Sequence, residues 1–497
     1  MRASHQTAVT FLVLAAFACS TATSPDLETG SEAAVQSAAE DPTAAVTSEE
    51  TATAATGACP TTAGSPQPFS LTAVTQEAGL IDPLTGMHGH AVAWGDVDGN
   101  GFPDLFVGTF ADRPDEKYQQ RGATGPSQDR LLFGSGASFA ETSPLETELG
   151  RTSGAAFVDL DNDGDLDLVA SRNARPDDGP LGLETQVFRN DGGSLTLVEA
   201  GFDNSLGGRT IGVLDYNLDG LLDLFIVEDR YRGGSSRLFR NESDLTFTDV
   251  TAEAGIPLDV NGRLDLVIGH HYNSTVDLDT EVAVRLYLNR SQGDNAAFID
   301  VTNEAGLSPL PTKAPHVEFA DMNNDGLLDI VTSASADNGS TPAIFMGNGF
   351  SDGVPTFETP AGLGSDQYWV SAPTVDFNRD GRLDVFLVEW EPSLPSLLFA
   401  GAADGNWLTV GLNEVSLAPG ADVAVYVGGE LGEADALIGH REITTSRGYS
   451  AGSEPMVHFE IGTIDAVDVL VTLRDGSAFT AEGVAANAFY LLPDGCG

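Results

Sequence analysis

The sequence predicts an all-β protein: a β-propeller of six or seven four-stranded blades, followed by a small β-sandwich or barrel. Three observations support this prediction. An acidic nine-residue motif occurs six times between residues 96 and 384, and each copy runs into an apolar segment. Short strand patterns surround the copies in a constant order, as in the blades of a propeller. After Gly405 the motif stops, while short alternating strands continue.

The first residues resemble an export signal. Residues 8–18 form an apolar run that ends in Ala16-Phe17-Ala18, a small-x-small cleavage pattern, so we assign 1–18 to a signal peptide. Cys19 follows at once, which is also typical of a bacterial lipid-attachment site, and both lipidation and simple cleavage stay open. Residues 19–66 are rich in Ala, Thr, Ser, Glu and Pro, a composition that predicts a disordered linker.

The chain has three cysteines. In an exported protein Cys59 and Cys496 form an even pair, which predicts a disulfide that ties the two ends of the folded part together. A retained and unmodified Cys19 would make the count odd and weaken this prediction.

Residues 67–403 are assigned to the propeller. In each repeat an inner strand runs into the acidic loop, a second strand leaves it, and two further strands follow. Residues 69–79 resemble a fourth strand without the first three, and the last repeat, ending at Phe399, lacks a fourth. We therefore expect the early strand to close the ring, since closure removes two open sheet edges. The fourth blade is the weakest, because only twelve residues separate Thr251 from Leu264.

Residues 404–497 are assigned to a second domain. Short alternating segments between glycine-rich turns predict a small all-β sandwich or barrel there. The seven expected strands are Trp407 to Asn413, Ala421 to Val427, Ala436 to Thr444, Met456 to Ile461, Val467 to Leu473, Ala478 to Val484 and Phe489 to Leu492.

The acidic motif has the features of a calcium-binding loop. Oxygen-bearing side chains at positions 1, 3, 5 and 9, a glycine at position 6 and a free carbonyl at position 7 form the oxygen cage that Ca²⁺ prefers. We expect about five sites, one per full copy. The predicted ligands, with the carbonyl donor fourth in each set, are Asp96, Asp98, Asn100, Phe102 and Asp104; Asp159, Asp161, Asp163, Asp165 and Asp167; Asp215, Asn217, Asp219, Leu221 and Asp223; Asp321, Asn323, Asp325, Leu327 and Asp329; and Asp376, Asn378, Asp380, Arg382 and Asp384.

The alternative interpretation is a set of turns that need no ion, since Asp and Asn favour such turns. Several carboxylates in one turn would repel each other without a cation, which favours the metal interpretation. The bidentate Glu that an EF-hand carries at position 12 is missing from every copy. In the damaged copy Pro257 replaces the first ligand and leaves Asp259, Asn261 and Asp265, so we expect no tight binding there.

Charge and loop position together predict where a partner binds. The net charge of -51 argues against nucleic acid and against simple adsorption to an anionic membrane. Because the acidic loops join first to second strands, the loops before the first and after the second strands lie on the opposite face. We interpret the basic and aromatic residues there as a ligand face for a protein or glycan; alternatively, these Arg side chains pair with nearby Asp. The ligand-face residues are His88, Arg151, Arg209, Arg230, Tyr231, Arg232, His271, Lys313, Tyr368 and Trp390.

The repeats over residues 69–400 resemble the FG-GAP/VCBS propeller repeats. The tail, with GNWLTVGLN, GADVAVYVGGE and GHREITTSRGYSAGSEPMVHFEIG, resembles the ASPIC/UnbV domain. The combination is similar to the cartilage acidic protein type and its bacterial relatives. This resemblance implies an extracellular or cell-surface protein that binds calcium and has no established catalysis.

We therefore expect an exported, monomeric calcium-binding adhesion module with an extracellular protein or glycan ligand. The alternative is a secreted polysaccharide-active enzyme on a propeller scaffold. The sequence holds no HExxH, phosphate-loop or Ser/Cys nucleophile motif, which makes the non-catalytic interpretation the preferred one.

Overall fold

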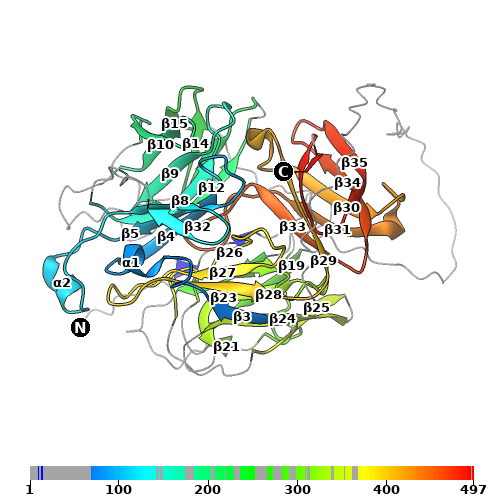
Figure 1. Cartoon of the computed structure of the whole chain (residues 1–497), viewed down its shortest axis with the longest axis horizontal. Helices are drawn as coiled ribbons and strands as arrows, with labels where there is room; N and C mark the ends of the chain where they lie inside the picture. Colours follow the sequence, from blue (N-terminus) through cyan, green and yellow to red (C-terminus); the bar gives the residue numbers. More distant parts are fainter. Residues whose placement is uncertain are drawn as a thin grey trace, which may run out of the picture.

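A computed structural model shows an all-β chain with two domains (Figure 1). It describes Val9–Thr10, Val13–Leu14 and most of residues 69–496. The intervals outside the described part, besides most of residues 1–68, are 142–144, 146–148, 174–183, 203–207, 218, 229–235, 252–265, 272–281, 290–297, 308, 311–313, 337–340, 352, 361–367, 494 and 497. In the described part, no helix is long and apolar enough to cross a membrane.

Six blade sheets make up the propeller in the described residues: five have four antiparallel strands, and the first has four antiparallel strands and a fifth strand that pairs in parallel. In all of them except the fourth, the strand that enters the acidic loop pairs with the strand that leaves it, as the repeat pattern predicts. The first three sheets are β4 (Gly89–Gly95), β5 (Asp104–Thr109), β6 (Arg130–Gly134) and β7 (Phe139–Glu141); β8 (Thr152–Val158), β9 (Asp167–Arg172), β10 (Gln186–Asn190) and β11 (Leu195–Val198); and β12 (Gly208–Leu214), β13 (Asp223–Glu228), β14 (Arg237–Asn241) and β15 (Phe247–Asp249).

The last blade is closed by the first strand of the propeller, which confirms the predicted ring closure. β3 (Ser70–Ala73) pairs antiparallel with β28 (Leu397–Ala402), with Ala73 opposite Phe399. The hydroxyl of Thr75 continues the junction by accepting the Leu398 N–H at 2.9 Å. The fifth and sixth sheets are β22 (Val317–Ala320), β23 (Asp329–Ala336), β24 (Thr341–Ser351) and β25 (Val354–Glu358); and β26 (Thr374–Val375), β27 (Asp384–Leu387), β28 and β3.

The fourth blade has an unexpected inner strand. β16 (Leu266–Ile268), β19 (Arg285–Asn289) and β20 (Phe298–Asp300) form its outer three positions, and β2 (Val13–Leu14) takes the inner one. The residues between Thr251 and β16, whose small number made the fourth blade the weakest in the sequence, lie outside the described part. A chain cleaved after Ala18 would lack β2, so in that chain this sheet would have three strands.

Short additional strands flank the ring. β1 (Val9–Thr10) pairs with β17 (His270–His271), and β18 (Val282–Ala283) pairs with β21 (Pro309–Leu310). The helices are brief: α1 spans Ile81–Leu84 and α2 spans Asp115–Gln119.

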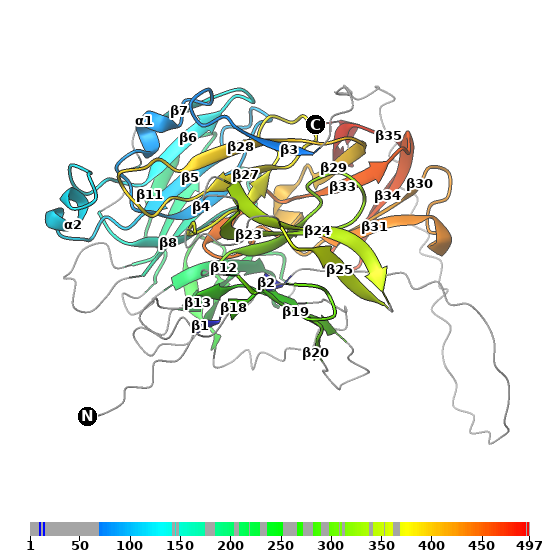
Figure 2. The ribbon, with the colours of Figure 1, turned by 90° about the horizontal axis from the view of Figure 1, so that it is seen from below.

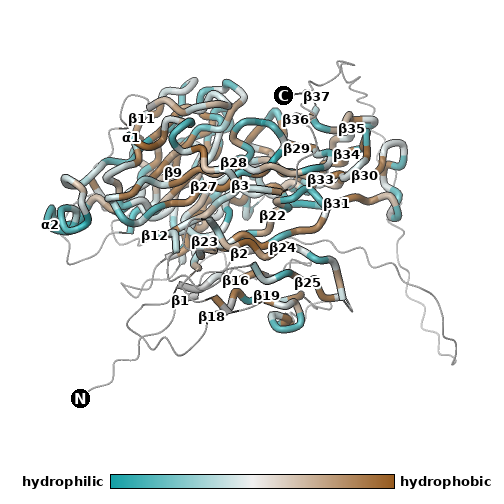
Figure 3. Tube along the Cα trace, turned by 60° about the horizontal axis from the view of Figure 1, so that its bottom comes forward, coloured by the Kyte–Doolittle hydropathy of each residue, from teal (hydrophilic) through white to brown (hydrophobic). Residues whose placement is uncertain are grey.

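Apolar clusters hold neighbouring blades together. The seam between the first and last blades is filled by residues from both, among them Trp94, Leu105, Phe377 and Phe386, whose ring lies edge-on to Trp94 at 5.7 Å. Figure 3 shows the hydrophobic colour along the strands of the blades, whereas α2 and many turns are hydrophilic. Burial of these faces is the main favourable contribution to a propeller fold.

The C-terminal domain is a sandwich of two four-stranded sheets, as predicted, with all seven expected strands present. Val410, Val423, Phe459 and Val469 are core residues between the sheets. One sheet contains β33 (Met456–Gly462), β29 (Asn406–Leu412), β36 (Ala488–Leu492) and β37 (Gly495–Cys496); the other contains β31 (Leu437–Glu442), β30 (Asp422–Val427), β34 (Ala466–Thr472) and β35 (Ala478–Ala485).

The C-terminal domain also contributes a strand to the propeller. β32 (Ala451–Gly452) pairs in parallel with the inner strand β4, with Ala451 opposite Val92, and Figure 1 shows it beside β4 and β8. Tyr449, just before it, is 2% exposed. The segment 448–452 therefore lies in the space that the inner strands surround, and we call it the plug. The two domains meet side by side in Figure 2 as well.

The plug requires glycine where its backbone comes closest to the second blade. A Cβ at Gly452 would lie 2.7 Å from the Ala155 carbonyl oxygen, whereas a Cβ at Gly212, also in a strand environment, would meet its nearest atom at 3.5 Å. We expect Gly452→Ala to lower the free energy of unfolding by about 1–3 kcal/mol through overpacking. Gly212→Ala is the matched control and should be neutral within about 1 kcal/mol. Urea unfolding measures both, and equal stabilities would contradict the assigned position of the plug.

Candidate metal centres and the opposite loop face

The five full acidic loops share one local structure. Each begins where an inner strand ends, and its ninth residue is the first residue of the second strand. The ninth-position aspartates Asp104, Asp167, Asp223, Asp329 and Asp384 are all fully buried. Apolar residues that follow them are buried in each second strand. Because this strand is held by its packing, the position of the loop that precedes it is set as well.

Each ninth-position carboxylate bridges two parts of its blade. One oxygen of Asp104 accepts the Val97 N–H of its own loop at 2.8 Å, and the other accepts the Gly134 N–H of the third strand at 2.8 Å. The same pair of bonds recurs in the other four loops. The carboxylate at position 1 likewise accepts two N–H groups, those of positions 5 and 6, as at Asp159 with Asp163 and Gly164.

Burial raises the pKa of these carboxyl groups. Removal from water, reinforced by neighbouring aspartates, raises the pKa of Asp104, Asp167, Asp329 and Asp376 to about 7. The pKa of Asp159 rises to about 6 for the same reasons. Clustered carboxylates without a counter-charge resist ionisation in this way, and a bound cation would remove that resistance.

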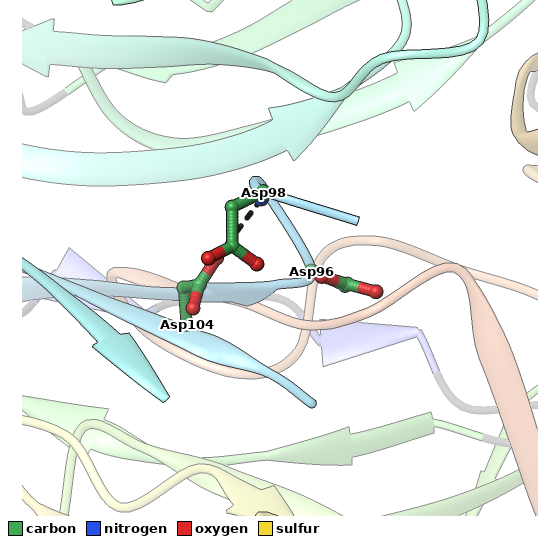
Figure 4. Close-up of side chains that lie close together, drawn as sticks. All are labelled: Asp96, Asp98 and Asp104. Atoms are coloured by element: carbon green, nitrogen blue, oxygen red, sulfur yellow. Dashed lines mark hydrogen bonds between the residues drawn. The ribbon is translucent and has the colours of Figure 1, made fainter. Parts of the chain in front are cut away.

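Two loops bring three carboxylates together. Ligand atoms of Asp96, Asp98 and Asp104 lie within 4.8 Å of one another, as do those of Asp159, Asp161 and Asp167. Figure 4 shows the first set, with the Asp98 N–H bonded to Asp104. In the other full loops an Asn replaces the acid at position 3, and Asn217, for example, bonds Asp219 at 2.8 Å.

The donor atoms fit a calcium ion. All side-chain donors are carboxylate or amide oxygens, which a hard cation prefers. In the second loop Asp161 Oδ1 is buried and has no hydrogen-bond partner within the described part of the chain. A buried oxygen without a donor costs free energy unless something binds it. This orphaned oxygen lies in the carboxylate group where an ion would sit.

Sequence reasoning missed the residue at position 4 of the loops. Asn162, Asn324 and Arg379 adopt positive φ of 57–59° there, and their side chains donate to the carbonyl of the position-6 glycine in the next loop around the ring. Arg379 makes this bond across the seam, from the sixth loop to Gly101 of the first, at 3.0 Å. The repeated Gly or Asn at this position was the available signal, because these residues tolerate the left-handed conformation.

The C-terminal domain covers part of this loop face. A Cβ at Gly381 in the sixth loop would lie 1.8 Å from the Trp407 ring, and one at Gly405 would lie 2.7 Å from the Asn324 carbonyl oxygen of the fifth. Arg474 lies 4.0 Å from the carboxylate of Asp215 in the third loop. The acidic loops therefore form much of the interface between the domains.

The predicted ligand-face residues that the structure describes are mostly buried. His88, Arg151 and Arg209 are 0%, 5% and 7% exposed, so these side chains do not form an open surface. Arg151 pairs with Asp112 at 2.7 Å, which is the pairing alternative that the sequence left open. Trp390 and Tyr368 keep partial exposure. The remaining predicted residues, Arg230, Tyr231, Arg232, Lys313 and the His271 side chain, lie outside the described part.

Aromatic and cationic side chains pack together at this end of the ring. The His90 ring stacks on Phe110 at 4.2 Å, and the Arg113 guanidinium lies 4.7 Å from the centre of the Trp390 ring. Tyr449 of the plug reaches the same cluster through its hydroxyl, 3.2 Å from His90 Nε2. The plug thus closes this end from within, which the sequence did not indicate.

A second buried cluster resembles a catalytic relay. Ser371 Oγ lies 3.0 Å from His316 Nδ1, and His316 Nε2 lies 3.3 Å from the carboxylate of Glu318. Ser371 and His316 are fully buried, and Ser371 donates to the Tyr449 carbonyl at 2.8 Å. The Ser371 bond to the Tyr449 carbonyl joins this cluster to the plug and helps to hold the plug in place.

Several predicted features fall outside what the structure describes. Cys19, Cys59 and the Cys496 side chain are among them, so lipidation and the disulfide stay predictions. The same holds for the damaged loop, including Asp259, Asn261 and Asp265.

Comparison with known proteins identifies the two units. Residues 88–122 match the family described as FG-GAP repeat, residues 258–332 match FG-GAP-like repeat, and residues 411–495 match ASPIC and UnbV. These segments of the chain are therefore similar to FG-GAP repeats and to an ASPIC/UnbV domain, which agrees with the resemblance found in the sequence.

Curated relatives that this chain resembles are named cartilage acidic protein 1. The protein of Homo sapiens is 28% identical over 358 residues, covering 65% of this chain and 50% of the relative, and that of Mus musculus is 26% identical over 429 residues, covering 77% and 60%. The chain thus spans about half the length of the curated relatives it matches. Among solved structures, the V. cholerae biofilm matrix protein Bap1 is 13% identical over 84% of this chain and 62% of its own, with a TM-score of 0.26, too low to support a conclusion about function.

Burial of His88 makes stability depend on pH. Desolvation lowers its pKa to about 4, and its Nδ1 donates to the Trp390 carbonyl at 2.8 Å. Unfolded histidine takes up a proton near pH 6.5, so the contribution of His88 to stability falls as pH drops from about 6.5 towards 4, by up to about 1.4 kcal/mol per unit. The raised carboxyl pKa values act in the opposite direction, and His88→Asn leaves them in place. His88→Asn keeps a donor near the Nδ1 position and should therefore gain stability relative to the wild type as the pH is lowered through this range, measured by urea unfolding at stepped pH. Parallel slopes for both proteins would contradict the prediction; buried His458, whose pKa falls to about 3, contributes equally to each.

Proposed function

We propose that this protein is an exported calcium-binding adhesion module, in which Ca²⁺ stabilises the blades and the opposite loop face binds an extracellular protein or glycan. The observation that carries the proposal is the recurrence of one oxygen-lined loop structure in the five full copies, all at the same face of the ring.

The ligands of each ion would be the residues at positions 1, 3, 5 and 9, as in Asp159, Asp161, Asp163 and Asp167. A bound cation would neutralise carboxylates that the fold has already removed from water. Because these carboxylates also join the loop to the second and third strands, metal binding would stabilise the whole blade. The role supported here is structural.

Support for the ligand face comes from its partly exposed residues. Trp390 and Arg113 form a cation–π pair at the rim, and Arg121 pairs with Glu391 beside them. Partly exposed aromatic side chains with adjacent guanidinium groups suit both protein hot spots and the faces of sugar rings. The plug fills this end of the ring from within, so a partner would bind across this rim and not inside the channel.

Metal removal tests the first half of the proposal. We expect EDTA to lower the melting temperature by many degrees, since each of about five sites held at 100 times its Kd adds about 2.7 kcal/mol. Asp161→Ala should remove one ion from the stoichiometry measured by isothermal titration calorimetry. Asp191→Ala removes an equal charge from an exposed turn of the same blade and should keep the full count. Identical melting with Ca²⁺ and with EDTA would refute calcium binding.

A glycan and matrix-protein array tests the second half. Trp390→Ala should lose most of the retained signal, because truncation of a central aromatic anchor costs about 2 kcal/mol or more. Phe350→Ala is the matched aromatic control, since Phe350 is 51% exposed on β24, away from this rim. Retention that survives Trp390→Ala would exclude this face. Soluble product released from a spotted polysaccharide would instead support an enzyme.

A further inference from the structure

Arg379 joins three parts of the molecule. It occupies position 4 of the sixth loop, and its Nε donates to the Gly101 carbonyl of the first loop at 3.0 Å. Its two terminal nitrogens bind both carboxylate oxygens of Glu454 from the C-terminal domain, at 3.0 and 2.6 Å. Its guanidinium carbon also lies 4.6 Å from the centre of the Phe489 ring. The ring seam and the domain interface therefore meet at one side chain.

This guanidinium lies among predicted metal ligands. Arg379 interacts electrostatically with Asp376 of the sixth loop and Asp96 of the first, as well as with Glu454. The pair is little exposed, with side-chain exposures of 13% for Arg379 and 10% for Glu454, so solvent screens these charges weakly. Asn324, at the same loop position in the fifth blade, makes the equivalent inter-loop bond without a charge.

A fixed positive charge beside a cation site weakens binding of the cation. Glu454 offsets that charge, because its carboxylate forms a bidentate pair with Arg379. The second loop has no such partner: its position-4 residue is the neutral Asn162, which bonds Gly220. Cation affinity at the first and sixth loops should therefore depend on a residue that only a docked C-terminal domain supplies.

We infer that the C-terminal domain controls cation binding at the first and sixth propeller loops, with Glu454 neutralising the Arg379 guanidinium that would otherwise compete with the ion. This inference rests on the proposed calcium binding. By linkage, cations bound at these two loops would in turn strengthen the docking of the C-terminal domain.

Calorimetric titration of the full chain with Ca²⁺ tests the inference. Glu454→Gln should weaken two of the sites on the order of tenfold and leave the rest unchanged. Glu430→Gln, which removes the same charge from an exposed turn of the same domain, is the matched control and should behave as wild type. Arg379→Asn installs the residue found at position 4 of the second and fifth loops, and it should strengthen the same two sites.

The double variant separates charge from folding. If Glu454 acts by neutralising Arg379, adding Glu454→Gln to Arg379→Asn should change the affinity little. Hydrogen exchange of residues 451–462 reports whether each variant keeps the domain docked. Equal affinities for Glu454→Gln and Glu430→Gln, or weaker binding by Arg379→Asn with the domain docked, would overturn the inference and leave calcium binding intact. A wild-type protein that binds no Ca²⁺ would overturn the proposed function as well.

Discussion

The structure depends on a buried carboxylate that holds three segments of each blade together. Asp104 and its four counterparts accept one N–H from the acidic loop and one from the third strand while they start the second strand. A neutral side chain of the same size cannot accept both bonds, because an amide presents a donor where the second N–H points. The ninth loop position therefore needs a side chain that accepts two N–H groups, and the fold must accommodate its negative charge away from water. A cation bound at the loop would stabilise the charge and leave both N–H bonds in place.

The same geometry joins neighbouring loops at three junctions in the described part of the ring. The chain turns back at position 4 through a left-handed residue, and the side chain there reaches the glycine carbonyl of the following loop. The sixth and first loops are neighbours in the ring but lie far apart in the sequence. There the longer Arg379 side chain bonds to the Gly101 carbonyl. Two contacts therefore close the ring: β3 pairs in the outer position of the last blade, and Arg379 bonds across the acidic-loop face.

Much of this architecture follows from patterns that are local in the sequence. The acidic motif fixed the start of each second strand, and the unpaired strand at residues 69–79 indicated closure, because both are properties of one short segment. The seven strands of the C-terminal sandwich followed from alternation for the same reason. The plug did not, because Tyr449 and Gly452 belong to a segment whose partners, His90, Val92 and Ala155, lie some 300 residues away and depend on how the domains dock. The sequence did not predict the burial of Arg151 and Arg209 for a related reason. The position of a loop in the repeat indicates on which face of the ring it lies, whereas the exposure of its side chains depends on what packs against that face.

Docking also gives the two faces of the ring different roles. On the acidic-loop face, Trp407, Gly405 and Glu454 contact the fifth and sixth loops, so ions there would lie next to the interface between the domains and not on free surface. At the opposite end Tyr449 anchors the plug beside His90 and Ser371, and Trp390 stays partly exposed at the rim in the described part of this face. One direct connection between a candidate ion and that rim is the inner strand β4, which enters the first acidic loop at one end, starts beside His88 at the other and pairs with β32 between them. Since β4 is fully buried and hydrogen-bonded on both edges, it can transmit a change in loop order only as a small rigid displacement. Calcium is therefore expected to act on stability and domain docking first, and on ligand affinity only through them.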